Sequence, residues 1–337
     1  MARDAMTALA PWQQRVLDGA LSALAEGRLG HALLLSGAPA MGKARVASLL
    51  SQRLLCRTPG VDGLGCGQCR GCRLFAAGTH PDRLDLTFAV HEKTGKLRSE
   101  LLVEQIRDLG HWFSLTPDLG GAQVAVIHPA HMLNRAAANA LLKTLEEPAR
   151  DRYLLLVTDQ PGRLPATIRS RCQRLEFRLP AAGEAHAWLV AQGHDASAAR
   201  TALDAARGHP GHAAAWLAEG GLALRGDIAR DLDALAADRA SPLETAQRWL
   251  ADERADLRLR FAAELALAGA AQRVAGGPTA GLTIPAEFQK LSAWFDRMNR
   301  TRAQLAAPAL RHDLALAGLL LEWRSLTRPT TMQGAGR

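Results

Sequence analysis

Long apolar runs are absent from this chain of 337 residues. No stretch of about 18 uncharged apolar residues occurs, which is the length that a membrane-spanning helix requires. The N-terminal sequence MARDAMTALAPW also lacks a basic region followed by an apolar stretch and a small-residue cleavage site. We therefore expect a cytoplasmic protein. Because the chain is too long for one compact core of usual size, we expect two or three domains.

Lysine is scarce as well, and it occurs only at positions 43, 93, 96, 143 and 290. The formal net charge is nevertheless +8, because arginine supplies the other basic side chains. A basic surface attracts the phosphates of nucleic acids, which favours contact with DNA. A bias towards arginine and alanine is also typical of GC-rich coding. The charge alone therefore leaves contact with DNA open, whether direct or within a complex.

Strand patterns are missing from the second part of the chain. Before residue 180, apolar segments alternate with helical periodicity, and they lie at residues 31–36, 123–127 and 153–157, with a shorter one near 174–179. Such strands predict an α/β domain with a largely parallel sheet that helices cover on both faces. From about residue 183 onward the sequence favours helices throughout.

Two breaks that contain glycine divide this helical part, at Gly208–Gly211 and at Gly220-Gly221. We therefore expect three domains: an α/β domain at 1–179, a small helical domain at 180–221 and a larger helical domain at 222–337. The scattered tryptophans of the helical part fit buried helical cores better than a surface on which bases stack.

A phosphate-binding pattern, Gly37-x-x-x-x-Gly42-Lys43, lies between a predicted strand and a predicted helix. Its glycines allow backbone N–H groups to surround phosphate oxygens, and Lys43 could reach the β and γ phosphates. The next residue is Ala44, where magnesium binding needs the hydroxyl of a Ser or Thr. The pattern therefore predicts a P-loop with one anchor for magnesium missing.

The carboxylates of an active ATPase are missing too. Acidic residues at the end of a second strand normally hold magnesium and position the attacking water. Here the strand at 123–127 is followed by His128 and Pro129, and imidazole is a poor ligand for a hard cation that prefers oxygen. Because these groups are absent together with the hydroxyl, the sequence predicts a nucleotide site that has lost catalysis.

Four of the five cysteines form one short cluster: Cys56, Cys66, Cys69 and Cys72. In a cytoplasmic chain such a cluster favours metal over disulfides, and four thiolates suit tetrahedral zinc. An iron–sulfur cluster and free structural thiols remain as alternatives. The cluster predicts a structural zinc-binding insertion, because no open coordination position is evident. Cys172 stands apart and is expected to pack as a small apolar residue.

A third candidate site is the segment from Thr167 to Cys172, with the sequence TIRSRC. An arginine beyond the end of a strand is often part of a solvated turn. In a P-loop protein, an arginine at a subunit edge can also stabilise a γ-phosphate that the next subunit binds. The residues alone leave both interpretations open for Arg171.

These patterns together resemble a known family, the clamp-loader subunits of bacterial DNA polymerase III. The resemblance rests on the P-loop, the four cysteines, Gly78–Asp82 (GTHPD), Val103–Arg107 (VEQIR), Ala138–Pro148 (ANALLKTLEEP) and Ser170–Cys172 (SRC). Together they cover about the first 180 residues. The ATP-hydrolysing gamma/tau members keep a Ser or Thr after the lysine and an Asp-Glu pair, so this chain is similar to the members without catalysis. The helical part also lacks the γ-phosphate-sensing arginine of the ATPase members, because Gly208-His-Pro-Gly211 offers none.

The resemblance implies an AAA+ (RecA-like) α/β core with a zinc-binding insertion, followed by a helical lid and an all-helical collar. It implies a stator in a ring of five subunits that contains gamma/tau and delta and that loads the sliding clamp onto primed DNA. Arg171, with Ser170 and Cys172 in the same motif, would act in trans on the ATP of a neighbouring subunit. Gly37, Gly42 and Lys43 would form a degenerate P-loop with weak or no nucleotide binding, and the four clustered cysteines would bind zinc.

Two rival functions remain at this stage. One is an active ATPase of gamma/tau type with an unusual metal site that includes His128. The other is a zinc-dependent DNA-binding module, although no element that reads bases is visible.

Overall fold

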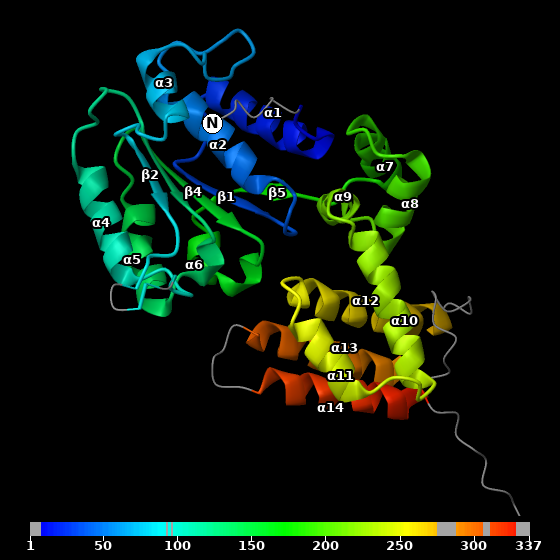
Figure 1. The fold of residues 1–337 in the computed structure, drawn as a ribbon. Helices are drawn as coiled ribbons and strands as arrows, with labels where there is room; N and C mark the ends of the chain where they lie inside the picture. Colours follow the sequence, from blue (N-terminus) through cyan, green and yellow to red (C-terminus); the bar gives the residue numbers. More distant parts are fainter. Residues whose placement is uncertain (1–7, 92–93, 96, 275–287, 306–310, 328–337) are drawn as a thin grey trace, which may run out of the picture. The chain divides into compact units, whose positions relative to one another are not determined.

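The computed structural model describes residues 8–91, 94–95, 97–274, 288–305 and 311–327 (Figure 1). The chain divides into two compact units, Met1–Ala215 and Trp216–Arg337, which are described separately below. The three-domain division stays a prediction. Among the described residues, no helix is both long enough and apolar enough to cross a membrane.

A five-stranded parallel sheet forms the centre of the first unit, with the strand order β2-β3-β4-β1-β5 (Figure 1). The strands are β1 (Ala32–Gly37), β2 (Arg83–Leu86), β3 (Gln123–Ile127), β4 (Arg152–Thr158) and β5 (Gln173–Phe177). Four of them confirm the predicted apolar segments and the parallel sheet. The edge strand β2 was not predicted from the sequence, because it is short and carries Arg83 and Asp85 between its two leucines.

Helices cover both faces of this sheet, as the continuous apolar strands predict. Leu33 and Leu35 of β1 face one layer, formed by α1 (Pro11–Ala25) and α2 (Lys43–Leu55). Leu34 belongs to the opposite layer, formed by α4 (Val103–Ser114), α5 (Arg135–Glu146) and the short α6 (Ala166–Arg169). Two 3₁₀ turns, η1 (Ala130–Met132) and η2 (Pro161–Arg163), follow β3 and β4.

The first unit also contains α3 (Arg70–Ala76), α7 (Ala182–Ala191), α8 (Ala196–Ala205) and the start of α9 (Pro210–Ala218). The Asp195 carboxylate caps α8 by accepting hydrogen bonds from the N–H groups of Ser197 and Ala198. Helix α7 packs on α1, because the rings of Trp12 and Trp188 meet edge to face with centroids 5.1 Å apart.

The second unit is helical throughout its described residues. Its helices are α10 (Gly221–Ala236), α11 (Pro242–Leu250), α12 (Ala255–Val274), α13 (Phe288–Gln304) and α14 (His312–Thr327). Three fully buried tryptophans anchor the core: Trp249, Trp294 and Trp323. The indole N–H groups of Trp294 and Trp323 donate to the carbonyls of Leu319 and Leu232, at 2.8 and 3.0 Å. This confirms the expectation that the tryptophans of the helical part pack in cores.

Candidate functional site

The P-loop joins β1 to α2, and its two glycines are favoured by a close approach of the backbone at Gly37 and by a left-handed backbone at Gly42. At Gly37, with φ +151°, an added Cβ would lie 2.3 Å from the carbonyl oxygen of Phe177. At Gly42, with φ +80°, an added Cβ would lie 2.1 Å from Nε2 of Gln13. A side chain at Gly37 would therefore clash with the backbone of β5, whereas a side chain at Gly42 would displace the end of Gln13 and would also have to adopt a left-handed backbone.

Helix α1 fixes the tip of this loop from outside. The buried Met41 offers its carbonyl oxygen to two donors on α1, the indole Nε1 of Trp12 at 3.2 Å and Nε2 of Gln13 at 3.1 Å. Both donors are themselves buried. The loop is therefore held in one shape by the chain itself.

Lys43, the first residue of α2, makes its polar contacts within this chain. Only 4% of its side chain is exposed, and its Nζ forms an ion pair with Oδ1 of Asp159 at 2.6 Å. The same nitrogen donates to the carbonyl of Gly37 at 2.9 Å and to the carbonyl of Ala38. Asp159 directly follows β4, and sequence reasoning missed it because it belongs to no motif. The ammonium group that would bind phosphates is neutralised by an internal carboxylate.

Ala44 and His128, which are far apart in the sequence, line the same small cavity at the carboxyl ends of β2 and β3. The cavity has a volume of about 190 Å³, and Ser48 and Asp85 also line it. The carboxylate of Asp85 is engaged by the guanidinium of Arg83, with Nε and Oδ2 2.9 Å apart. The structure therefore brings Ala44 and His128 together, and neither side chain suits magnesium. The nearby carboxylate of Asp85 is already paired with Arg83.

The start of α9 lies directly against the P-loop. An added Cβ at Gly211 would be 1.9 Å from the carbonyl oxygen of Ala40, so only glycine permits this contact. The chain breaks between α8 and α9 at Gly208, whose φ is +78°, which confirms the predicted break. The glycine at position 211 therefore allows the start of α9 to pack directly on the P-loop.

The segment Thr167–Cys172, called the arginine loop below, lies at the end of α6. Arg171 is 38% exposed, and its NH2 group forms an ion pair with Oε1 of Glu146 at 2.7 Å. Its NH1 group donates to the carbonyl of Thr167 at 3.0 Å, and the hydroxyl of Ser170 donates to the same carbonyl at 3.1 Å. Cys172 is buried in the core below α5 and α6, and burial raises the pKa of its thiol to about 11. The loop therefore exposes the arginine and anchors the cysteine as an apolar residue, as predicted for Cys172.

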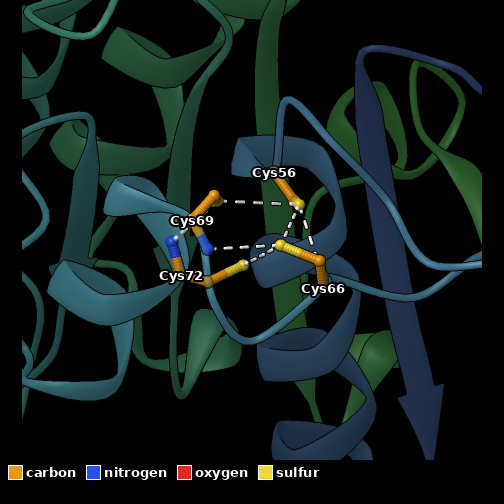
Figure 2. A group of neighbouring side chains, drawn as sticks. All are labelled: Cys56, Cys66, Cys69 and Cys72. Carbon is orange, nitrogen blue, oxygen red and sulfur yellow. Dashed lines mark hydrogen bonds between the residues drawn. The ribbon is translucent and has the colours of Figure 1, made fainter.

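The four clustered cysteines converge from three segments (Figure 2). Cys56 ends α2, Cys66 lies in the following loop, and Cys69 and Cys72 begin α3. All four Sγ atoms lie within 4.8 Å of one another, and the Cys56–Cys66, Cys56–Cys69 and Cys66–Cys72 pairs are 3.6, 3.9 and 4.0 Å apart. Zinc–sulfur bonds of about 2.3 Å in a tetrahedron require sulfur atoms about 3.8 Å apart. The cluster could therefore hold a metal ion.

The polar surroundings favour thiolate at two of these cysteines. A hydrogen bond with the hydroxyl of Thr58 is the main cause that lowers the pKa of Cys66 to about 6, and backbone N–H groups add to it. The backbone N–H of Cys72 lowers the pKa of Cys69 in the same way. Burial instead raises the pKa of Cys72 to about 12. A cation is therefore needed to stabilise four thiolates together.

The GTHPD segment has a structural role beside the cluster. The carboxylate of Asp82, which is 1% exposed, accepts hydrogen bonds from the N–H groups of Asp118 and Leu119 at 2.8 and 2.9 Å. Nδ1 of the buried His80 accepts from the N–H of Asp82 at 3.1 Å, and burial lowers the pKa of this histidine. These contacts fix the loop before β3, a role that the sequence pattern alone did not indicate.

A parallel sheet whose first strand leads through a glycine loop and a lysine into a helix defines the first unit as a P-loop α/β protein. A family model described as "DNA polymerase III, delta subunit" matches residues 12–181. The chain is 42% identical over 187 residues to the DNA polymerase III subunit delta′ of Pseudomonas aeruginosa, and 39% identical over 208 residues to that of Escherichia coli. The chain belongs to this family, among its delta′ subunits.

The similarity is limited to part of each relative. The matches cover 55% and 61% of this chain, and 53% and 60% of the two delta′ subunits. The chain is also 40% identical over 169 residues to the DNA polymerase III subunit tau of Escherichia coli, which covers 50% of this chain and 24% of that protein. The family model itself covers the parallel sheet, the P-loop and Arg171, and it ends before the helical second unit.

Proposed function

We propose that this chain is a non-catalytic subunit of the DNA polymerase III clamp loader, which helps to load the sliding clamp onto primed DNA. In this role it does not hydrolyse ATP, and it supplies Arg171 to the ATP site of a neighbouring gamma/tau subunit. Gamma/tau and delta are its partners in a hetero-pentameric ring, and the clamp and DNA are reached through that complex. This proposal also implies a location in the cytoplasm.

The observation that carries this proposal is the internal neutralisation of Lys43. Its ion pair with Asp159 and its two carbonyl contacts take up the group that would bind the β and γ phosphates. Ala44 and His128 supply neither the hydroxyl nor the carboxylate that magnesium needs. A site with its lysine engaged and its magnesium anchors absent supports a role without hydrolysis.

The architecture proposed for this role has an AAA+ core at 1–179, a lid at 180–221 and a collar at 222–337. The five-stranded parallel sheet and the helical second unit support it. The contact between Gly211 and the P-loop supports the assignment of α7, α8 and the start of α9 as a lid.

We further propose that Cys56, Cys66, Cys69 and Cys72 bind one structural zinc ion. Zinc would link the end of α2 to the start of α3. In the sequence these two helices are connected only by an irregular loop. Metal analysis of the purified chain should give about one zinc per chain, and Cys69→Ser should lose it. Cys172→Ser is the matched control and should retain the metal. Iron in place of zinc, or equal metal content in the two variants, would overturn this assignment.

The zinc site also predicts a pH dependence for the metal-free protein. Because the pKa of Cys66 is lowered to about 6 from an ordinary value of 9.0, its thiolate stabilises the fold at high pH, and this contribution is lost as the pH falls through 6. Thiolate absorbance of the metal-free chain should therefore have a component with a midpoint near 6. That component should be absent in Cys66→Ser.

The function itself is tested by ATP turnover and by partner choice. The purified chain should show negligible ATP hydrolysis with or without primed DNA, and it should form a complex with gamma/tau and delta in a pull-down. Hydrolysis at the rate of a gamma/tau subunit would favour the rival ATPase function. Tight binding of DNA by the isolated chain, without these partners, would favour the DNA-binding module.

A further inference from the structure

Arg171 is restrained by two contacts, one with Thr167 in its own loop and one with Glu146, which lies outside that loop. The carboxylate of Glu146, the last residue of α5, lies 2.7 Å from the NH2 nitrogen. The carbonyl of Thr167 lies 3.0 Å from NH1 and accepts a hydrogen bond from it. Both terminal nitrogens of the guanidinium therefore already have acceptors within the chain.

The ion pair between Arg171 and Glu146 is open to solvent. The side chain of Arg171 is 38% exposed and that of Glu146 is 51% exposed, so another molecule can approach the guanidinium. Exposed ion pairs are weak, whereas a phosphate group offers more negative charge and more acceptor oxygens than a carboxylate. A phosphate from a neighbouring subunit can therefore displace Glu146 from the arginine.

We propose that Glu146 is a positioning residue that competes with the γ-phosphate of the neighbouring subunit's ATP for the guanidinium of Arg171. This inference rests on the proposed function, in which Arg171 acts in trans. A phosphate bound at NH2 would lie next to the carboxylate, and like charges at that distance repel each other. The carboxylate must therefore release the arginine before the phosphate binds.

The ion pair with Glu146 therefore weakens the binding of ATP at the neighbouring subunit's site. Each time the arginine engages the γ-phosphate, the ion pair with Glu146 has to break. Removing the charge of Glu146 should therefore strengthen ATP binding at that site. It should not change the rate of hydrolysis once the arginine contacts the γ-phosphate. A residue with a purely structural role would instead lower turnover or disturb assembly.

The neighbouring residue Glu147 provides a matched control. It is exposed, carries the same charge one position further along, and forms no ion pair among the residues that the structure describes. Glu146→Gln and Glu147→Gln therefore remove the same charge from adjacent positions, and only the first removes a contact with Arg171.

The experiment measures ATP hydrolysis by loaders assembled with gamma/tau and delta and with each variant of this chain. The site next to this chain is resolved as the component of the ATP titration that is lost in the Arg171→Ala loader. For that component, Glu146→Gln should lower KM two- to fivefold and keep kcat within about twofold, since an exposed ion pair contributes a factor of up to about five. Glu147→Gln should leave both parameters at the parent values.

The possible results separate the inference from the function on which it rests. An unchanged or raised KM in Glu146→Gln, relative to Glu147→Gln, overturns the inference if Arg171→Ala still depresses turnover. A fall in kcat with Glu146→Gln shows that the carboxylate holds the arginine in its active position instead. If Arg171→Ala leaves turnover intact, the proposed function itself fails.

Discussion

The P-loop and the arginine loop belong to the same α/β unit, but their cationic side chains differ in exposure and in the contacts that hold them. Lys43 is 4% exposed and bound to a carboxylate and two carbonyls of its own chain. Arg171 is 38% exposed and held by a single carboxylate and a single carbonyl at the surface. A buried, fully engaged cation serves the fold, whereas an exposed and loosely held one remains available to another molecule.

This difference supports the roles proposed for the two loops. A P-loop lysine that binds nucleotide has to be free to meet phosphate, and here burial and Asp159 remove that freedom. The arginine loop keeps the opposite balance, with its cysteine buried in the core and its arginine at the surface. Substitutions in the two loops should therefore change different properties, and a substitution in α9 tests the contact made with the P-loop.

The largest expected effect is that of Arg171→Ala in the assembled loader. Arginines supplied in trans typically accelerate phosphoryl transfer by at least about a thousandfold, so ATP turnover at the neighbouring site should fall by about that factor. Size-exclusion chromatography should show an intact complex. The free energy of unfolding of the chain alone should change by less than about 1 kcal/mol, because the ion pair with Glu146 is exposed.

Arg178→Ala is the control for this substitution. Arg178 is also an exposed arginine that pairs with a glutamate, with NH2 and Oε2 of Glu176 2.8 Å apart. Turnover should stay at the parent level. Equal losses with the two substitutions would mean that general basic charge matters, and the contrast between the two loops would lose its basis.

Lys43→Met should have the second largest effect, and it should act on stability rather than on turnover. Removing one partner of a buried ion pair costs about 3–5 kcal/mol, and we expect about 2 kcal/mol here because solvent screens Asp159. Urea denaturation of the chain measures this loss. Lys143→Met, an exposed lysine on α5, should change stability by no more than about 0.5 kcal/mol.

A combined substitution separates the ion pair from the P-loop geometry. Lys43→Met together with Asp159→Asn should recover part of the lost stability, because no unpaired carboxylate remains beside the loop. The assembled loader should hydrolyse ATP at close to the parent rate with either variant. A tenfold fall in turnover with Lys43→Met would instead show that this P-loop binds a nucleotide that matters.

The smallest expected effect is that of Gly211→Ala. Its added Cβ would lie 1.9 Å from the carbonyl oxygen of Ala40, so α9 has to shift away from the P-loop. We expect a loss of about 1 kcal/mol, at the low end for overpacking, because the start of a helix can move. Gly183→Ala in α7 meets no atom within 4 Å and should be neutral or stabilising. If Gly211→Ala instead raised the free energy of unfolding, the close contact between α9 and the P-loop would not contribute to stability.

Much of the fold could be predicted from local patterns, because these patterns reflect local physics. The apolar segments that became β1, β3 and β4 are continuous, as strands buried on both faces have to be. The edge strand β2 was missed because its four residues include two charged ones and carry no such pattern. The cysteine spacing predicted a compact cluster, and the four sulfur atoms do converge.

The sequence by itself determined which groups are missing and which are present: no hydroxyl after Lys43, no acidic residue after β3, and an arginine followed by a cysteine beyond α6. Only the tertiary structure decided which partners these residues meet. Asp159, Gly211 and Glu146 lie far from the motifs that they contact, and no periodicity connects them. The physical reason is that residue type and spacing fix local chemistry, whereas the pairing of distant charges depends on how the sheet and its helices pack.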